Sequence, residues 1–191
     1  MNLQNNLWNC HDNNENENKC CPKVVFAILP TDPTGPQGLT GETSPTGPQG
    51  GILNYADFYA LMPDDNAATV APGADVSFPQ DGANNGTSIT RTGDSSFNIS
   101  EIGTYQIYFN VPVTEAGQLQ LTLNGTPLDY TVVGRATGTS DISGIFLIET
   151  TTINSILTVR NPAGNTTALT ITPSAGGTNS VSAHLVITQI A

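Results

Sequence analysis

Residues 35 to 50 read GPQGLTGETSPTGPQG, and glycine recurs in this stretch on a single three-residue register. The glycines in that register are Gly35, Gly38, Gly41, Gly47 and Gly50. Only glycine fits at the axis of three wound polyproline II chains, so the register predicts a collagen-like triple helix and therefore a trimer. The alternative is a Pro/Gly linker in which the register arose by chance.

The register is short and contains one break. Ser44 stands where the next glycine belongs, and about five triplets are too few to hold three chains together by themselves. We therefore expect the trimer to depend mainly on another part of the chain.

Composition divides the chain into three parts. Residues 1–29 form an arm that begins Asn-rich and ends in an apolar run, residues 30–51 form a Pro/Gly spacer, and residues 52–191 form a folded domain. The first part of the arm, residues 1–19, has few apolar side chains, which is typical of a segment that is disordered in isolation.

Residues 52–191 are predicted to be all-β, because apolar and polar residues alternate with period two in several runs. The clearest run covers residues 104–113, and one of its faces carries Tyr105, Ile107, Phe109, Val111 and Val113. Asn124 and Gly125 both tolerate positive φ, so residues 118–124 are expected to form a hairpin with a return strand. That return strand is predicted to pass through Leu128, Tyr130 and Val132.

Short strands are predicted along the rest of the domain as well. They cover residues 55–61, 75–78, 88–91, 96–100, 142–149, 155–160, 168–172 and 181–190. Spaced short strands without an amphipathic helix favour a β-sandwich, here a jelly roll of roughly eight to ten strands.

The apolar run in the arm is interpreted as a docking strand. It consists of Val24, Val25, Phe26, Ala27, Ile28 and Leu29, so both faces of a strand would be apolar. That pattern is typical of a strand buried on both sides. A tethered strand of this kind can pair with another subunit by β-augmentation. The alternative is an extra strand of the chain's own jelly roll.

All three cysteines, Cys10, Cys20 and Cys21, lie in the arm. An odd number in the arm and none in the folded domain favours disulfides between subunits. Cys20 and Cys21 are poorly placed to bond each other, because a disulfide needs more widely spaced Cα atoms. Zinc ligation together with His11 is the alternative, but the spacing lacks a C-x-x-C unit. We therefore predict no metal site.

The charge is strongly acidic, with 16 acidic against 5 basic residues and a net charge of -11. From residue 24 onward the basic residues are Arg91, Arg135 and Arg160. This balance argues against nucleic acid and anionic membrane as partners. No apolar run approaches the ~20 residues that span a bilayer, and residues 1–9 lack the regions of a secretory signal peptide.

The motifs do not favour catalysis. The chain has no nucleophile elbow, phosphate loop or H-E-x-x-H motif, and we predict neither an enzyme nor a cofactor. His184 falls on the polar side of the last strand and is expected to serve the structure or a trimer interface. Asp64, Asp65 and Asn66 are interpreted as an acidic turn, with calcium binding as the alternative.

Several segments of the domain resemble one known family. They are GTYQIYFNVPV at 103–113, LTLNG at 121–125, ILTVRNPAG at 156–164 and HLVITQI at 184–190. With the collagen-like spacer before them, their order resembles the BclA-type collagen-like proteins of bacterial spore surfaces. The resemblance implies a jelly roll with the tumour-necrosis-factor-like fold that forms a homotrimer.

The N-terminal part is similar in layout to subunits of spore appendage fibres, in which a Cys-bearing arm couples one subunit to the next. The resemblance therefore implies a structural protein of the exosporium or of an endospore appendage, made without a signal peptide. BclA-type proteins usually have a long stalk, whereas the collagen-like region here covers only residues 35–50. That difference favours a self-assembling fibre of trimers stacked head to tail.

The resemblance also bears on glycosylation, and an alternative function is open. Glycosylation of Thr40, Thr43 or Thr46 is implied by the family. The alternative to a fibre subunit is a trimeric tip adhesin, or an exosporium surface protein whose arm docks on a different anchor protein.

Overall fold

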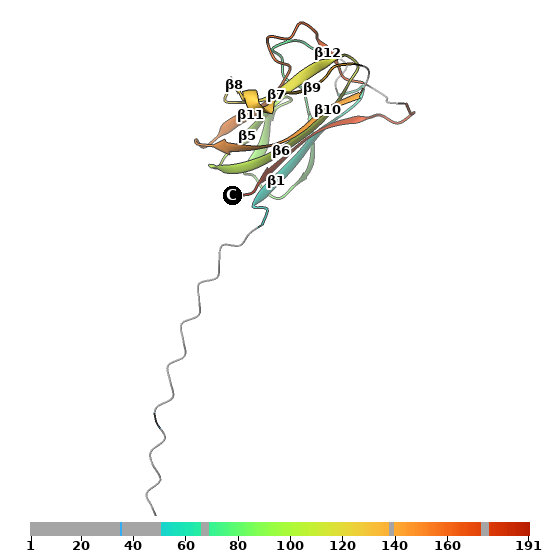
Figure 1. Cartoon of the computed structure of the whole chain (residues 1–191). Helices are drawn as coiled ribbons and strands as arrows, with labels where there is room; N and C mark the ends of the chain where they lie inside the picture. The colour runs from blue at the N-terminus through green and yellow to red at the C-terminus, as the bar shows by residue number, and fades with distance from the viewer. Residues whose placement is uncertain (1–34, 36–50, 66–68, 138–139, 173–175) are drawn as a thin grey trace, which may run out of the picture. The chain divides into compact units, whose positions relative to one another are not determined.

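The computed structural model describes residue 35 and residues 51–65, 69–137, 140–172 and 176–191. The chain divides into two compact units, residues 1–46 and 47–191, and nearly all described residues belong to the second. This second unit consists of β-strands packed in two layers (Figure 1). Its described part contains one 3-10 helix, Asp129–Thr131, and no helix of the length and apolar content that a membrane crossing needs.

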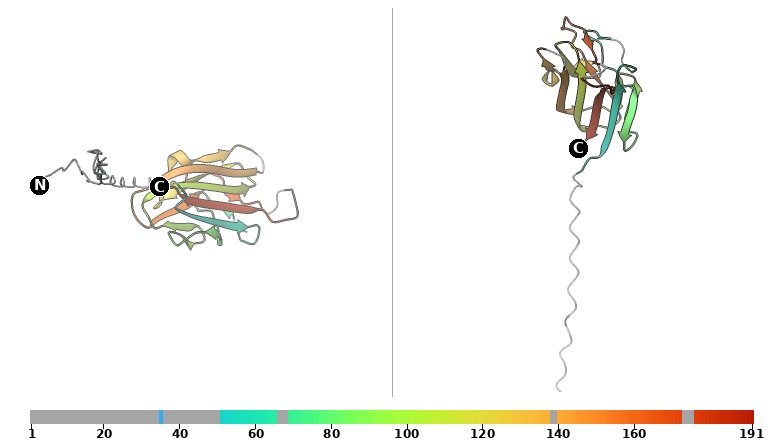
Figure 2. Two further views of the ribbon diagram at one scale, coloured as in Figure 1. Left: turned by 90° about the horizontal axis from the view of Figure 1, so that it is seen from below. Right: turned by 90° about the vertical axis from the view of Figure 1, so that its right-hand side faces the viewer.

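One layer is an antiparallel sheet of five strands in the order β10-β6-β13-β1-β3, which we call the β6 sheet. Its strands are β1 (Asn54–Leu61), β3 (Gln80–Asn84), β6 (Gly103–Val113), β10 (Ser140–Thr150) and β13 (Ser182–Gln189). β1 and β13 lie side by side and antiparallel (Figure 2), so the start of β1 lies beside the C-terminal end of β13.

The other layer, which we call the β7 sheet, runs β4-β5-β11-β7-β8, and β9 also pairs with β7. Its strands are β4 (Ile89–Gly93), β5 (Ser96–Ile99), β7 (Gly117–Leu123), β8 (Thr126–Pro127), β9 (Val133–Arg135) and β11 (Ser155–Arg160). A short ladder of β2 (Thr69–Val70) and β12 (Leu169–Thr170) lies at the end of the sandwich away from the C-terminus (Figure 1). Because the chain passes repeatedly between the two sheets, the prediction of an all-β jelly roll is confirmed.

The core fills the space between the sheets. The residues predicted to share one face of 104–113 are all fully buried. Phe97 joins the layers, with its ring centroid 4.6 Å from that of Phe58 and 6.1 Å from that of Phe78. Burial of such large apolar side chains is the main stabilising term of a sandwich. Burial also raises the pKa of Tyr105, whose hydroxyl donates to the Glu101 carbonyl at 2.9 Å.

The hairpin turn is confirmed at Asn124 and Gly125, whose φ angles are 53° and 79°. These positive values are those that a tight two-residue turn between antiparallel strands requires. Asn124 also fixes the turn against β11, because its side-chain oxygen accepts a hydrogen bond from the Ile156 amide at 2.8 Å.

The predicted return strand through Leu128, Tyr130 and Val132 is wrong. β8 ends at Pro127, and residues 129–131 form the 3-10 helix. Thr131 explains the departure, since its hydroxyl accepts from the Leu121 amide at 2.9 Å and donates to the Leu128 carbonyl at 2.7 Å. A side chain thus replaces the backbone pairing that the alternating pattern suggested.

Four further segments differ from the prediction, and one of them is β9, whose three residues were assigned to no predicted strand. Residues 75–78 form no strand, and Asp75 makes only an isolated bridge with Arg160. β3 was not predicted, because its sequence QDGAN is polar at nearly every position and lies at the sheet edge. β2 was not predicted either, since a two-residue strand has no period to detect. The other predicted strands are present with slightly different ends.

Candidate self-association surface

The outer face of the β6 sheet presents apolar side chains that the domain's own core does not use. Ile145 of β10 is paired with Tyr108 of β6, and Tyr108 is paired with Val186 of β13. Ile145 is 63% exposed, and Leu147, the next outward residue of β10, is 57% exposed. We call these residues, Tyr108, Ile145, Leu147 and Val186, the apolar patch.

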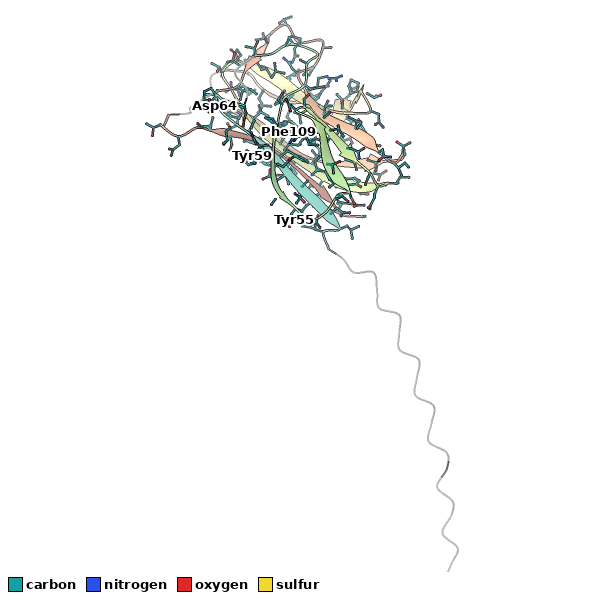
Figure 3. All side chains as sticks on the ribbon, turned by 180° about the vertical axis from the view of Figure 1, so that it is seen from behind. Tyr55, Tyr59, Asp64 and Phe109 are labelled. Carbon is teal, nitrogen blue, oxygen red and sulfur yellow. The ribbon has the colours of Figure 1, made fainter. Side chains whose placement is uncertain are left out.

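Two tyrosines of β1 border the apolar patch. Tyr55 and Tyr59 occupy outward positions of β1 (Figure 3), because the alternate residues Ala56, Phe58 and Ala60 are buried. Tyr59 is paired with His184 across the sheet, and their rings are stacked with centroids 5.8 Å apart. The two tyrosines therefore lie on the same face as the apolar patch, on either side of Asp57, which is paired with Val186.

His184 makes polar contacts with side chains of β1 and β13 on this face. Its Nδ1 lies 3.0 Å from Asp57 Oδ1, and its Nε2 lies 3.0 Å from Ser182 Oγ. The prediction that His184 lies on the polar side of the last strand is confirmed, because its chain neighbours Ala183 and Leu185 are fully buried. Two partners on one ring fix its orientation beside Tyr59.

An aspartate, a histidine and a serine in contact have the composition of a hydrolytic triad. A triad also needs amide donors aimed at a developing oxyanion. The residues of β13 around His184 are paired with β1 on one side and with β6 on the other, so their amides are used within the sheet. The contacts that the structure shows join β13 to β1 through the side chains of His184 and Asp57.

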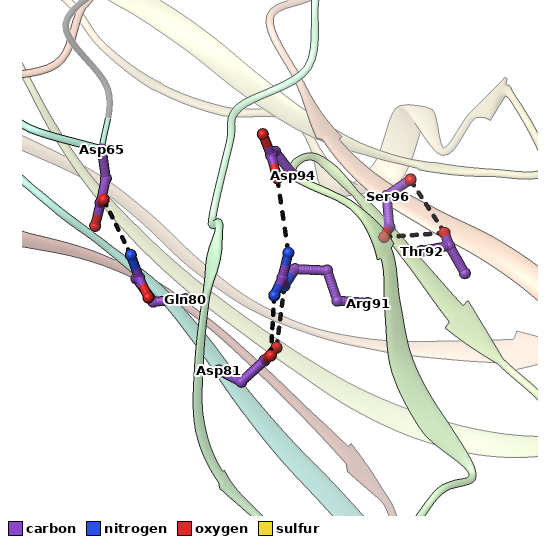
Figure 4. Close-up of polar contacts among 7 residues, drawn as sticks. All are labelled: Asp65, Gln80, Asp81, Arg91, Thr92, Asp94 and Ser96. Atoms are coloured by element: carbon purple, nitrogen blue, oxygen red, sulfur yellow. Dashed lines mark hydrogen bonds and ion pairs between the residues drawn. The ribbon is translucent and has the colours of Figure 1, made fainter.

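The acidic turn after β1 has a structural explanation. Asp65 Oδ2 accepts the Leu61 amide at 2.7 Å, and its Oδ1 accepts Gln80 Nε2 at 3.1 Å (Figure 4). Asp64 lies in the same turn (Figure 3), whereas Asn66 is outside the described residues. Across the described ranges, no group of His, Cys, Asp and Glu side chains is arranged to hold a metal ion.

Arg91 marks a second polar cluster, on the β7 sheet. Its Nε and Nη2 donate to the carboxylate of Asp81 at 3.0 and 2.9 Å, and its Nη1 lies 3.6 Å from Asp94 (Figure 4). The hydrogen bonds from Arg91 lower the pKa of Asp81 despite some opposing desolvation. The Asp81 side chain is 56% exposed, so the pair adds little to stability.

Most residues predicted from the arm and spacer lie outside the described part of the chain. They are Cys10, Cys20, Cys21, the docking strand Val24–Leu29 and the register glycines Gly38, Gly41, Gly47 and Gly50. Gly35 is described, and a Cβ added there would meet nothing within 4 Å. The docking, disulfide and collagen roles of these residues remain predictions.

Sequence reasoning did not identify the apolar patch, although β10 contains a signal for it. The strand reads SDISGIFLIET, in which Ile145 and Leu147 are apolar on the face opposite Ile142 and Ile148. Apolar residues on both faces are typical of a strand that is covered on both sides. The outward residues were predicted only as part of a strand.

Comparisons with known proteins agree with this fold. A family model described as the BclA C-terminal domain matches residues 62–191. Murine APRIL, solved at pH 5.0, aligns at 15% identity and a TM-score of 0.50, covering 71% of this chain and 98% of that one. The globular domain of zebrafish complement 1qA aligns at 10% identity and a TM-score of 0.50, covering 72% and 96%.

No curated protein matched the sequence directly. The two solved structures support the jelly-roll fold only, because their identities are low. The family model covers more than half of the chain and includes β6, β10 and β13, which bear the apolar patch. The chain therefore belongs to the BclA C-terminal domain family, as the resemblance implied.

Proposed function

We propose that this protein is a structural subunit of a spore-surface fibre and that it forms homotrimers through the outer face of the β6 sheet. The single observation that supports the trimer best is the apolar patch, with Ile145 63% and Leu147 57% exposed on a regular sheet. Contiguous exposed apolar groups of this kind are typical of interaction surfaces. Membership of the BclA C-terminal domain family supports a place on the exosporium or an appendage.

The energetics favour a closed trimer over a pair. Burying one large apolar side chain contributes about 1.5–3 kcal/mol, whereas association costs about 4–15 kcal/mol in lost freedom. A dimer gains one interface for one such loss of freedom. A closed ring of three copies gains three interfaces for two such losses, so the gain per copy is larger.

In this proposal the arm couples one trimer to the next. The docking strand Val24–Leu29 pairs with the neighbouring subunit, and the spacer 30–51 sets the reach. At about 3.1 Å per residue an extended spacer reaches roughly 70 Å. Three arms leave each trimer together, so their weak individual docking gains by multivalency. The glycine register from Gly35 to Gly50 would wind the three spacers about one another.

Disulfides between subunits would then lock the joint. Cys10, Cys20 and Cys21 are the cysteines of the chain, and the folded domain has none. Because no partner thiol exists in the domain, a covalent link must join arm to arm. The proposed role is structural rather than enzymatic.

Electrophoresis of the full-length protein without and with reductant tests the covalent lock. We expect a ladder of linked chains without reductant and a single band of 19.9 kDa with it. Replacing Cys10, Cys20 and Cys21 together with serine should abolish the ladder. A single 19.9 kDa band in both lanes would contradict the disulfide part of the proposal.

A further inference from the structure

The start of β7, the end of β9 and a loop before β12 surround a hollow of about 460 Å³. Residues 116–118, 134–136 and 165–167 line it. The hollow is separate from the apolar patch, since none of these segments belongs to the outer face of the β6 sheet. Its volume lies within the roughly 300–1,000 Å³ that small-molecule sites occupy.

Arg135 is the charged residue of this hollow, and its hydrogen bonding is incomplete. Its Nη2 donates to the carbonyls of Val113 and Glu115 at 3.0 and 2.8 Å. Its Nε and Nη1 are buried and have no acceptor. A buried donor without a partner is costly, and more so when the group is charged. The two carbonyls fix the guanidinium while leaving part of its donor capacity unused.

The other described arginines have carboxylate partners. Arg91 pairs with Asp81, and Arg160 pairs with Asp75 at 2.7 Å. Within the described ranges no carboxylate lies at ion-pair distance from Arg135. Glu115 is near in sequence, but it meets Arg135 through its backbone carbonyl, and its carboxylate accepts the Thr170 amide at 2.6 Å. Arg135 therefore lacks the direct counter-ion that the other two possess.

Neutral polar groups surround this cation. Gln118, Thr166 and Thr167 line the hollow, and all three are exposed. In the described part of the molecule their side chains make no hydrogen bond, so they can serve as donors and acceptors for hydroxyl groups. A cation beside several free hydroxyl and amide groups matches a ligand that combines one carboxylate with several hydroxyls.

We infer that this hollow binds a small polyhydroxylated carboxylate of the sugar-acid class. Its carboxylate accepts from the unused guanidinium donors of Arg135, and its hydroxyls bond Gln118, Thr166 and Thr167. Charge-assisted hydrogen bonds of this kind are about twice as strong as neutral ones. A Cβ on Gly134 would lie 2.6 Å from Gln118 Cγ, so the Gln118 side chain lies over this strand beside Arg135.

Calorimetric titration of the full-length protein tests the inference with D-glucuronate, D-glucose and inorganic phosphate as probes. We expect saturable binding of glucuronate, with glucose and phosphate each at least about tenfold weaker, which corresponds to about 1.4 kcal/mol. Arg135→Gln should abolish glucuronate binding, and Arg91→Gln, which removes an arginine already paired with Asp81, should leave it unchanged.

Arg135→Gln also removes two contacts to backbone carbonyls, so a second variant isolates the hollow. Thr166→Phe fills it from an exposed position and leaves Arg135 intact; it should weaken glucuronate binding at least about tenfold with an unchanged melting temperature. Absence of glucuronate binding to the wild type, equal binding of phosphate, or undiminished binding by either variant would overturn the inference. None of these results depends on whether the protein forms fibres.

Discussion

The two outer faces of the sandwich have the same backbone geometry and opposite chemistry. On the β6 sheet the outward residues include Tyr108, Ile145 and Leu147, which are exposed. On the β7 sheet the outward residues include Thr122 and Thr158, which are buried and hydrogen-bonded to each other at 2.8 Å. One face leaves apolar groups without a partner, whereas the other satisfies its polar groups within the chain.

The polar network of the β7 sheet continues through Asp75. Thr158 donates to Asp75 Oδ1 at 2.9 Å, and Arg160 reaches the same carboxylate through Nε at 2.7 Å and Nη2 at 3.1 Å. The hydrogen bonds from Asp75 raise the pKa of Arg160, so this cation stays charged. The polar side chains of this network therefore find their partners within one chain.

The difference shows that the two sheets of one fold can carry different outward side chains. Period-two alternation puts core residues inside on both sheets, and the outward set is then free to vary. On the β7 sheet, threonine and arginine side chains are hydrogen-bonded within the chain, whereas tyrosine, isoleucine and leucine leave exposed apolar groups on the β6 sheet. In the proposed trimer, the outward residues of the β6 sheet determine which face meets another copy.

The largest expected effect comes from placing a charge in the apolar patch. Ile145→Glu would put a carboxylate into each trimer interface, where burying an unpaired charge costs at least about 2 kcal/mol per subunit. In a chain lacking residues 1–29, light scattering should show monomers instead of trimers. Ile153→Glu is the matched control, because Ile153 is 66% exposed but lies in a loop. Trimers of the Ile145→Glu protein would disprove the interface.

A second test breaks the network on the other face. Asp75→Ala leaves Arg160 without its carboxylate, and the side chains of Asp75 and Arg160 are only 20% and 24% exposed. We expect the free energy of unfolding to fall by about 2 kcal/mol in chemical denaturation, with the trimer retained. Asp81→Ala, which breaks the more exposed pair with Arg91, should cost less than about 1 kcal/mol. If both variants lost the same unfolding free energy, the more buried ion pair would not be the more stabilising one.

The stability that Glu115 contributes should depend on pH. Desolvation acts to raise the pKa of Glu115, but hydrogen bonds from Thr170 and the charge of Arg135 outweigh it and lower the pKa. A carboxyl with a lowered folded pKa contributes stability above its unfolded pKa and loses it as the pH falls through the folded value. Unfolding free energy should therefore decrease below about pH 4.5. Glu115→Gln should flatten this decrease in denaturation series at several pH values, and an unchanged slope would contradict it.

The smallest expected effect concerns the hairpin of the β7 sheet. Gly125 has a φ of 79° and open space around it, so Gly125→Ala tests conformation alone. A left-handed residue with a Cβ costs about 1 kcal/mol. Gly164→Ala is the control, since that glycine also has open space and no positive φ. Thermal melting should show a loss for Gly125→Ala only.

The sequence pattern predicted which residues of this fold face the core. It was less successful with the residues that face outward. Alternation alone identified β6 with its buried face, and Asn124-Gly125 identified the hairpin turn. Both signals are local, since they depend on side-chain period and on backbone conformation. The course of residues 128–132 was missed, because it depends on the Thr131 hydroxyl reaching a strand ten residues away.

Contacts between distant strands at His184 and Arg135 could not be predicted from the sequence either. His184 was placed on the correct face by its spacing from Ala183 and Leu185, but its contact with Asp57 requires the pairing of β1 with β13. The sequence did not predict that Arg135 has unused hydrogen-bond donors. That property depends on which carbonyls and carboxylates the fold brings near its guanidinium. Sites made from distant strands need the register, which local patterns do not contain.

Self-assembly through the arm is tested by electron microscopy of negatively stained full-length protein beside a version lacking residues 1–29. We expect fibres from the full-length chain and separate trimers from the shortened one, because in the proposal the domain alone makes the trimer and the arm joins trimers. Separate trimers from both preparations would contradict self-assembly through the arm.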